Sequence, residues 1–313
     1  MEESKGMSPS KISAVGKPVK VLLDTDIGGD IDDAACLAYL LRQPNCELLG
    51  ITTVCGNPLE RAMIADAICQ VAGKTIPIYP GLDPKTPNGW YPTPDGQVKL
   101  KNWKHRTDFA QDKAVDFLYE TICTYPNEVN LIGIGSFSNI AALFAKYPDA
   151  PDKLKEIAGM AGVFDEEINA SDAMPYCNWN VWADPLAAKT VFSRARHIRV
   201  YGLEITRQLT LSREEVKTLF TSDILQAVVD FGEPWLAENT MTFHDPLVAT
   251  AVFNRNICTY RRGYIEIDTR SANEETLGRT TFIPDAQGNC ELATSVNIKG
   301  FFASYFEVVN SLR

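Results

Sequence analysis

Positive charge, long apolar runs, paired cysteine motifs and histidine are all scarce in this sequence. The 30 lysines and arginines against 40 acidic residues give a net charge of −10, which argues against nucleic acid or an anionic membrane surface as a partner. No run of about 18 apolar residues occurs, so no membrane-spanning helix is expected. The chain has only three histidines, which limits the candidates for imidazole chemistry.

None of the eight cysteines forms a C-x-x-C pair, and most lie in apolar runs such as "AACLAYLL". They are expected to be reduced core residues of a cytoplasmic protein, not a disulfide framework or a zinc site. The polar opening, residues 1–17, lacks the apolar segment of a signal peptide. It is predicted to be a flexible tail ahead of one domain over residues 18–313.

Short strand-like runs alternate with helical stretches along most of the chain, and 45% hydrophobic residues supply enough apolar mass for a large core. Strands separated by helix-length segments indicate parallel β-α-β units. We therefore predict a single α/β domain on an open, doubly wound, mostly parallel sheet, with ligands bound beyond the carboxyl ends of the strands. Strands are expected at 19–26, 48–56, 76–81, 129–135, 156–164 and 197–206, with helices at 32–44, 59–74, 113–126, 137–148 and 184–195.

Two regions depart from this alternation. Residues 82–111 are rich in proline, glycine, lysine and aromatics, which predicts a mobile loop over the ligand-binding edge. In the C-terminal third, "SREEVKTLF", "DILQAVVDFGEPWLAEN" and "HDPLVATAVF" predict helices. The runs "RGYIEID", "RTTFIP" and "ELATSVNI" predict a small antiparallel elaboration before a last helix.

The stretch "DTDIGGDIDD" puts five aspartates into ten positions. Asp24 and Asp26 end the first predicted strand, while Asp32 and Asp33 open the next helix, whose N-terminus favours anions. Two like charges 4 Å apart repel by roughly 4 kcal/mol at an effective dielectric near 20. Carboxylates that fold together therefore hold a cation, keep protons or point into water.

Three interpretations of this cluster stay open. In the first interpretation, one aspartate caps the helix and the others face water, which explains two aspartates better than five. A divalent cation explains all of them, and carboxylate ligation favours Mg²⁺ or Ca²⁺ over zinc or copper. An EF-hand is excluded because the twelfth position from Asp24 is Ala35. The third interpretation is an aspartate nucleophile for Mg²⁺-dependent phosphoryl transfer.

Among the histidines, His244 stands in the motif best suited to catalysis, directly before Asp245 in "TFHDPLVATAVF". An Asp245 N-cap followed by Pro246 would be a common helix opening, but it leaves His244 without a role. A proton donor beside a metal-binding carboxylate would give it one. His197 is expected to be structural and His105 to be solvated.

Three asparagines complete the pattern. Asn57 follows the predicted strand at 48–56, and Asn178 and Asn180 precede a predicted helix. Each alone is most often a turn residue. Amides, carboxylates and an imidazole at several strand ends together indicate a site that grips a polyhydroxyl ligand.

With these motifs in this order, the sequence resembles the nucleoside hydrolases, the inosine–uridine-preferring family of N-ribohydrolases. The similarity runs from "VLLDTDIGGDIDDA" through "LLGITTVCGN", "IPIYPG", "AVDFLYETICTYPNEVNLIGIGSFSNIA" and "NWNVWADPLAA" to "HDPLVATAVF". The resemblance implies an open α/β sheet, a bound Ca²⁺ and hydrolysis of the bond between ribose C1′ and a base. It also implies a homodimer or homotetramer that acts on small nucleosides in purine and pyrimidine salvage.

The resemblance also implies a role for each matching residue. Asp26 would hold Ca²⁺ and act as general base to the attacking water, and His244 would act on the departing base. The other Ca²⁺ ligands would be Asp33, Asp245 and the backbone carbonyl of Ile134. The ribose would be held by Asp32, Asn57, Met160, Asn178 and Asn180.

Two positions depart from the family pattern. The first motif is commonly Asp-x-Asp-Pro-Gly-x-Asp-Asp, but here Ile27 replaces proline and two residues are added, so Asp30 is extra. Asn178 stands where the family usually has glutamate, which predicts a weaker hold on the ribose 5′-hydroxyl; the alternative is that Asp172 or Glu167 restores a carboxylate there. This change leaves open a nucleoside- or ribose-binding protein without turnover. The Mg²⁺-dependent phosphatase also stays open, although no matching lysine motif follows.

Overall fold

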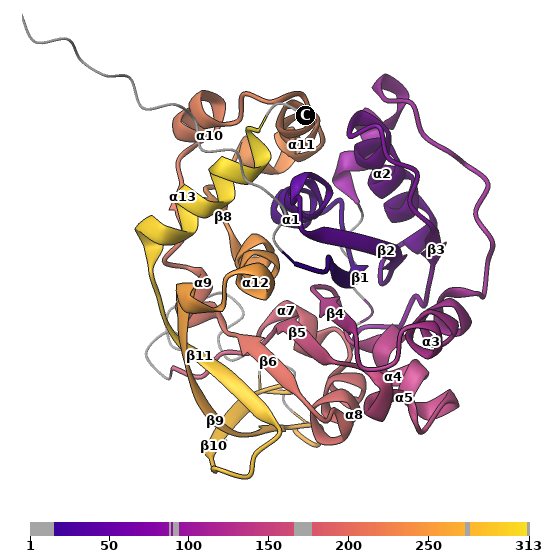
Figure 1. The fold of residues 1–313 in the computed structure, drawn as a ribbon, viewed down its shortest axis with the longest axis vertical. Helices are drawn as coiled ribbons and strands as arrows, with labels where there is room; N and C mark the ends of the chain where they lie inside the picture. The colour runs from indigo at the N-terminus through magenta and orange to yellow at the C-terminus, as the bar shows by residue number, and fades with distance from the viewer. Residues whose placement is uncertain (1–15, 88, 90–93, 166–176, 273–275, 312–313) are drawn as a thin grey trace, which may run out of the picture.

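The structure is a computed structural model that describes residues 16–87, 89, 94–165, 177–272 and 276–311. A nine-stranded sheet runs through these residues in the order β10-β9-β11-β6-β5-β4-β1-β2-β3 (Figure 1). The six strands from β3 to β6 are mutually parallel, as predicted. They are β1 (Val19–Thr25), β2 (Cys46–Thr53), β3 (Ile78–Pro80), β4 (Val129–Gly133), β5 (Glu156–Met160) and β6 (Ile198–Tyr201).

The predicted antiparallel elaboration continues the same sheet. Strand β11 (Cys290–Val296) lies parallel to β6 and antiparallel to β9 (Cys258–Ile267), which pairs in turn with β10 (Thr280–Pro284). A separate two-stranded sheet joins β7 (Thr210–Leu211) to β8 (Met241–Thr242).

Helices cover both faces of the sheet, so side chains that alternate along β1 enter two different cores. Val21 and Leu23 pack into one apolar cluster and Leu22 into the other, and all three are fully buried. The first cluster takes in helices α1 (Asp32–Arg42), α2 (Pro58–Val71), α11 (Asp223–Leu236), α12 (His244–Phe253) and α13 (Ile298–Val309). The second takes in α3 (Ala114–Thr124), α4 (Ser138–Lys146) and α8 (Pro185–Arg194). The doubly wound α/β fold is confirmed.

Some predicted boundaries are wrong. The strand expected at 197–206 ends at Tyr201, and the chain then turns into α9 (Leu203–Thr206) after Gly202. Short helices α5 (Ala150–Lys153), α7 (Trp179–Trp182) and α10 (Arg213–Leu219) complete the described helices outside 3₁₀ turns.

Residues 82–111 are not simply a loop. Their described part contains the 3₁₀ helix η1 (Asp95–Asn102), and Gly96 N donates to Gly28 O at 3.0 Å. Trp103 Nε1 donates to Asp230 Oδ2 of α11 at 2.7 Å, so the segment is hydrogen-bonded to that helix. Within it, His105 is half-buried instead of solvated, and its Nδ1 lies 2.7 Å from Trp103 O.

Other predictions concern the chain ends, the cysteines and His197. Residues 1–15 lie outside the described residues, so the tail over 1–17 and the domain boundary at residue 18 stay predictions. Within the described ranges, none of the helices combines the length and apolar character needed to cross a membrane. All eight cysteines are free thiols and six are buried, but Cys46 is half-buried and Cys123 is exposed, so these two are not core residues as predicted. His197 is exposed at the start of β6, outside the site described below.

Strand order explains where a ligand can bind. Along the sheet the order β3-β2-β1-β4-β5-β6 reverses at β1, whose neighbours are β2 and β4. In doubly wound sheets the chain leaves such neighbouring strands in opposite directions and opens a crevice at their carboxyl ends. Asp26 follows β1 and Ile134 follows β4, so both stand at this crevice.

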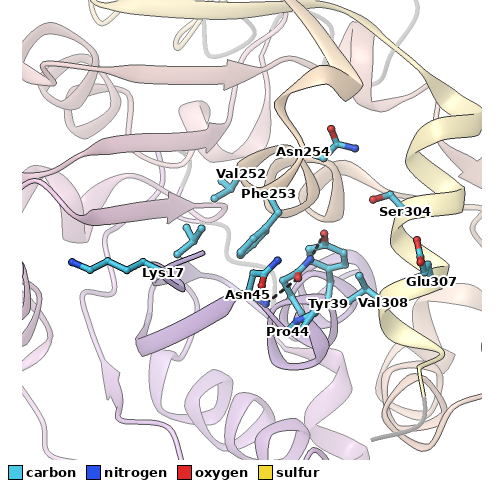
Figure 2. Close-up of a pocket in the computed structure, with 12 residues that line it drawn as sticks. Lys17, Tyr39, Pro44, Asn45, Val252, Phe253, Asn254, Ser304, Glu307 and Val308 are labelled. Atoms are coloured by element: carbon cyan, nitrogen blue, oxygen red, sulfur yellow. Dashed lines mark hydrogen bonds between the residues drawn. The ribbon is translucent and has the colours of Figure 1, made fainter. Parts of the chain in front are cut away.

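A second hollow lies at the C-terminal ends of helices α1 and α12. A cavity of about 340 Å³ is lined by residues at the C-terminal ends of α1 and α12 and on α13, including Tyr39, Phe253 and Glu307 (Figure 2). Tyr39 follows Asp32 by seven residues in α1, so the nearest lining residue of this helix is about 10 Å along its axis from the end that carries Asp32 and Asp33. It is therefore separate from the candidate active site.

Candidate active site

The predicted carboxylates come together at the N-terminal ends of α1 and α12. Asp32 and Asp33 lie in the first turn of α1, and Asp245 lies in the first turn of α12. The backbone N–H of Asp245 donates to Asp32 Oδ2 at 3.2 Å, which joins the two helices directly. With Asp26, these four carboxylates are at most 8% exposed. Helix α12 begins at His244, so Asp245 is not its N-cap.

Burial and crowding make this group of carboxyls suited to a cation. One oxygen from each of Asp30, Asp32 and Asp33 lies within 4.8 Å of the others. Burial first, and then neighbouring carboxylates, raise the pKa values of Asp32, Asp33 and Asp245 well above the ordinary range. Asp33 interacts with both Asp26 and Asp30, and Asp245 interacts with Asp32 and Asp33. Such a set of oxygens fits a divalent cation that prefers oxygen ligands.

Asp26 is held through both its side chain and its backbone. Trp179 Nε1 donates to its Oδ2 at 3.1 Å. The fully buried guanidinium of Arg61 donates to the backbone carbonyls of Asp26 and Ile27, and at 2.5 Å to Cys55 O. Burial raises the pKa of Asp26 to about 6, although the positive charge of Arg61 opposes the shift.

Ile134 and Asn180 connect the ends of two strands. Ile134 N donates to Asp24 O at 2.9 Å, so the residue after β4 is fixed against β1. The amide nitrogen of Asn180 donates to Ile134 O at 2.8 Å and to Met160 O at 3.0 Å. A carbonyl oxygen has two lone pairs, so Ile134 O can accept this hydrogen bond and still coordinate a cation.

Asn178 is buried beside the same strand end. Its Nδ2 donates to Met160 Sδ at 3.3 Å, while its Oδ1 has no hydrogen-bond partner among the described residues. A buried acceptor without a partner is costly, and a ligand hydroxyl can satisfy it. Glu167 and Asp172, the alternative source of a carboxylate here, lie outside the described residues.

Asn57 has a structural role in the described chain. It is exposed, adopts a left-handed backbone with φ of 68°, and caps α2 by accepting from Glu60 N at 3.3 Å. The capping bond uses Oδ1 and leaves the amide N–H₂ as the group that can reach a ligand.

His244 is half-buried at the first position of α12, with Nδ1 2.7 Å from Thr206 Oγ1. Burial, helped by the positive charge of Arg207, lowers the pKa of His244 to about 4. The imidazole is therefore neutral near pH 7, and the predicted proton donor would act through its remaining ring N–H. When the Thr206 hydroxyl donates to Nδ1, the ring hydrogen lies on Nε2 and can be donated to a ligand.

Two residues of the site were missed from the sequence. Trp179 contacts Asp26 and is flanked by Asn178 and Asn180, which were both predicted to bind substrate. Its position between the two asparagines in "NWN" was the signal in the sequence that could have pointed to Trp179. Arg61 is the one basic residue of the largely apolar α2, and the sequence gives no indication that its side chain turns back toward β1.

Comparison with known proteins decides the family. The family model described as "Inosine-uridine preferring nucleoside hydrolase" matches residues 21–303. The chain belongs to this family. It is 28% identical over 276 residues to "Uridine nucleosidase 1" of Arabidopsis thaliana, covering 82% of this chain and 80% of the relative. It is 26% identical over 300 residues to the inosine-uridine preferring nucleoside hydrolase of Leishmania major, covering 90% and 93%.

Solved structures of nucleoside hydrolases share the fold. A plant nucleoside hydrolase superposes with a TM-score of 0.79 at 22% identity, covering 95% of this chain and all of the other. A purine-preferring ribonucleoside hydrolase from Gardnerella vaginalis gives 0.78 at 23% identity, covering 93% and 98%.

Membership of this family makes the protein a nucleoside N-ribohydrolase, an enzyme that hydrolyses the N-glycosidic bond of ribonucleosides. The comparisons give no support to the Mg²⁺-dependent phosphatase or to the binding protein without turnover. The acidic cluster can hold a metal ion.

Proposed function

We propose that this nucleoside hydrolase depends on Ca²⁺ and releases ribose and a free base, with Asp26 as the general base. The observation that supports it best is the buried carboxylate cluster at the crevice between β1 and β4. Such carboxylates cannot all be charged in a dry site unless a cation lies among them.

The proposed ligands are Asp26, Asp33, Asp245 and the Ile134 carbonyl. Mg²⁺ demands a near-ideal octahedron and usually keeps several waters, whereas Ca²⁺ takes six to eight oxygens in flexible geometry. Asp30 and Asp32 add further oxygens to the same cluster, and so large an oxygen set favours Ca²⁺. When bound, Ca²⁺ would lower the pKa of a coordinated water and hold the ribose diol.

Asp26 is suited to removing a proton from the attacking water. A cation bound by these carboxylates would keep Asp26 ionised and able to accept a proton. Hydrolysis of a glycosidic bond passes through a transition state in which positive charge develops on the sugar. Buried carboxylates around the ribose stabilise that charge.

The ribose would be held by groups that the described contacts leave available. Asp32 is proposed to accept from a ribose hydroxyl, and Asn180 and Asn57 to hold the sugar with their amides. Met160 ends β5 and lies against the amide groups of Asn178 and Asn180, so its side chain would form the floor under the sugar.

His244 is proposed to stabilise the departing base. A neutral imidazole with its hydrogen on Nε2 can donate a hydrogen bond to a ring nitrogen or carbonyl oxygen of the base as negative charge develops there. This role needs no positively charged histidine. Relatives named uridine nucleosidases make uridine the first substrate to test. A cytoplasmic homodimer or homotetramer acting in salvage remains a prediction.

These roles are tested with Asp26→Asn and His244→Phe in an assay of reducing sugar released from uridine, cytidine, inosine and adenosine. Asp26→Asn should lower kcat by about 10²–10⁴-fold for every substrate, because one positioned base serves them all. His244→Phe should lower kcat most for the bases that leave least readily. Near-normal turnover by Asp26→Asn would contradict the general base, whereas a small uniform effect of His244→Phe would remove only its leaving-group role.

A further inference from the structure

The carboxylate of Asp26 is bounded on each side by a residue of this chain. On one side, Trp179 Nε1 donates to Oδ2 at 3.1 Å. On the other, Gly135 leaves room for Oδ1, since a Cβ added there would lie 3.2 Å from Oδ1 and 2.9 Å from Asp26 N. The two oxygens of the candidate base are thus in different surroundings.

The indole of Trp179 is itself fixed. It packs against Val54, Cys55 and Ala183, and its ring lies 5.5 Å from that of Trp182 at an interplanar angle of 42°. Asn178 and Asn180 on either side of it are bonded to Met160 and Ile134, so the backbone that carries the indole is anchored to β5 and to the residue after β4.

Arg61 fixes the backbone of Asp26 from the opposite direction. Its guanidinium donates to the carbonyls of Asp26 and Ile27 and also to those of Cys55 and Gly56, which follow β2. The backbone contacts place the Cα of Asp26 but leave its carboxylate free to rotate, because the terminal torsion of aspartate has a broad energy minimum. The indole N–H of Trp179 acts on the carboxylate itself and can therefore select one orientation.

We propose that Trp179 is a positioning residue that orients Asp26 by engaging Oδ2, so that Oδ1 is the oxygen that accepts the proton of the attacking water. The inference rests on the proposed role of Asp26 as general base. Trp179 sets the direction of that base, and small errors in the direction of a catalytic group reduce the rate steeply.

The first test is Trp179→Phe, which keeps an aromatic ring and removes the N–H donor. Its kcat for uridine should fall by about 10- to 100-fold, a part of what a positioned base contributes. Its KM should change by less than about threefold, because the sugar contacts remain. A KM effect without a kcat effect would instead indicate a role in sugar binding and would overturn the proposal.

Trp103→Phe is the matched control. Trp103 also donates its indole N–H to an aspartate, Asp230 Oδ2 at 2.7 Å, but this bond joins the segment after η1 to α11. The control should lose a comparable hydrogen bond and keep kcat within about twofold. An equal loss of kcat in both variants would show a general effect on stability and contradict the positioning role.

The second test needs no turnover. Calcium alone is titrated into the metal-free protein while tryptophan emission and binding heat are recorded. Wild type and Trp103→Phe should change emission on binding Ca²⁺, because the indole of Trp179 is bonded to a proposed ligand of the ion. Trp179→Phe should bind Ca²⁺ by calorimetry and lose most of this change. A full emission change in Trp179→Phe would overturn the proposal.

If Trp179→Phe fails to fold, benzothienylalanine incorporated at position 179 keeps the shape of the indole and replaces its N–H by sulfur. The same loss of kcat is expected from it, and wild-type kcat would contradict the proposal. Absence of ribose release by the wild-type protein would instead contradict the proposed function itself.

Discussion

At the scale of single residues, Asn178 is the proposed sugar-binding residue that departs from the family pattern. Its amide oxygen is buried and has no partner among the described residues, while its nitrogen faces the sulfur of Met160. A glutamate at this position would add a charge and a stronger acceptor. An amide offers a neutral acceptor, which contributes about 0.5–1.5 kcal/mol to a hydrogen bond against about 1.5–3 kcal/mol for a charged one.

We therefore expect weak dependence on the ribose 5′-hydroxyl. Replacing uridine by 5′-deoxyuridine should lower kcat/KM by about tenfold, in keeping with the loss of one neutral hydrogen bond. Asn178→Glu should increase this dependence. The neighbouring Asn180, which is bonded to Ile134 O, stays the same in this variant, so the change is confined to position 178. A loss of about a thousandfold in the natural enzyme, equivalent to about 4 kcal/mol, would show that the 5′ end is firmly held and would contradict the expectation.

The sequence predicted which charged residues come together at the candidate site better than it predicted the residues that hold them. Asp26, Asp32, Asp33 and Asp245 could be found because carboxylates at strand and helix ends form a recognisable pattern. Trp179 could not be assigned to Asp26, because the two lie 153 positions apart and only the fold makes them neighbours. The neutral state of His244 was equally hidden, since it results from burial and not from the motif.

At the scale of elements, Asp24 connects β1, β2 and α4. Its Oδ1 accepts from Thr52 Oγ1 at 2.5 Å and from Asn139 Nδ2 at 2.7 Å. Its Oδ2 is buried without a partner in the described structure. Burial raises the pKa of Asp24 from 3.8 to about 7, so the folded protein keeps a proton that the unfolded chain releases. The stability from this proton is fully present below about pH 4 and is lost as the pH rises through about 7.

Asp24→Asn should remove this pH dependence, because the amide keeps the acceptor oxygen and does not titrate. Relative to wild type, its free energy of unfolding should increase by about 2–3 kcal/mol between pH 5 and pH 8. Urea denaturation in the presence of a chelator measures this difference without a contribution from bound metal. An identical difference between variant and wild type at both pH values would mean that Asp24 is ionised throughout.

The sequence predicted the positions of helices and strands wherever apolar periodicity was strong. It failed where contacts between residues distant in sequence determine the local structure. The buried runs of β1, β2 and β4 and the helices between them lie close to their predicted places. The helix η1 was missed because proline, glycine and lysine usually indicate a loop. Its order depends on Gly28 and Asp230, which belong to other parts of the chain.

At the scale of the whole molecule, the strand order brings together residues that are more than 200 positions apart. The reversal of direction at β1 opens the crevice, and α1 and α12 lie side by side (Figure 1) with Asp32 bonded to the first turn of α12. The alternation of strands and helices predicted the parallel sheet and its ligand-binding edge. It could not predict that β11 returns beside β6 and extends the sheet, because that pairing is set by the length and turns of the C-terminal segment.

The most direct test of the account is the metal dependence of ribose release. Protein stripped of metal with a chelator, and shown to be metal-free by elemental analysis, is assayed with uridine and inosine before and after addition of CaCl₂ or MgCl₂. We expect no release of reducing sugar from the stripped protein, restoration by Ca²⁺, and a smaller effect of Mg²⁺, because the site offers many oxygens in an irregular arrangement. Full ribose release by the metal-free protein would contradict the proposed Ca²⁺-dependent hydrolysis.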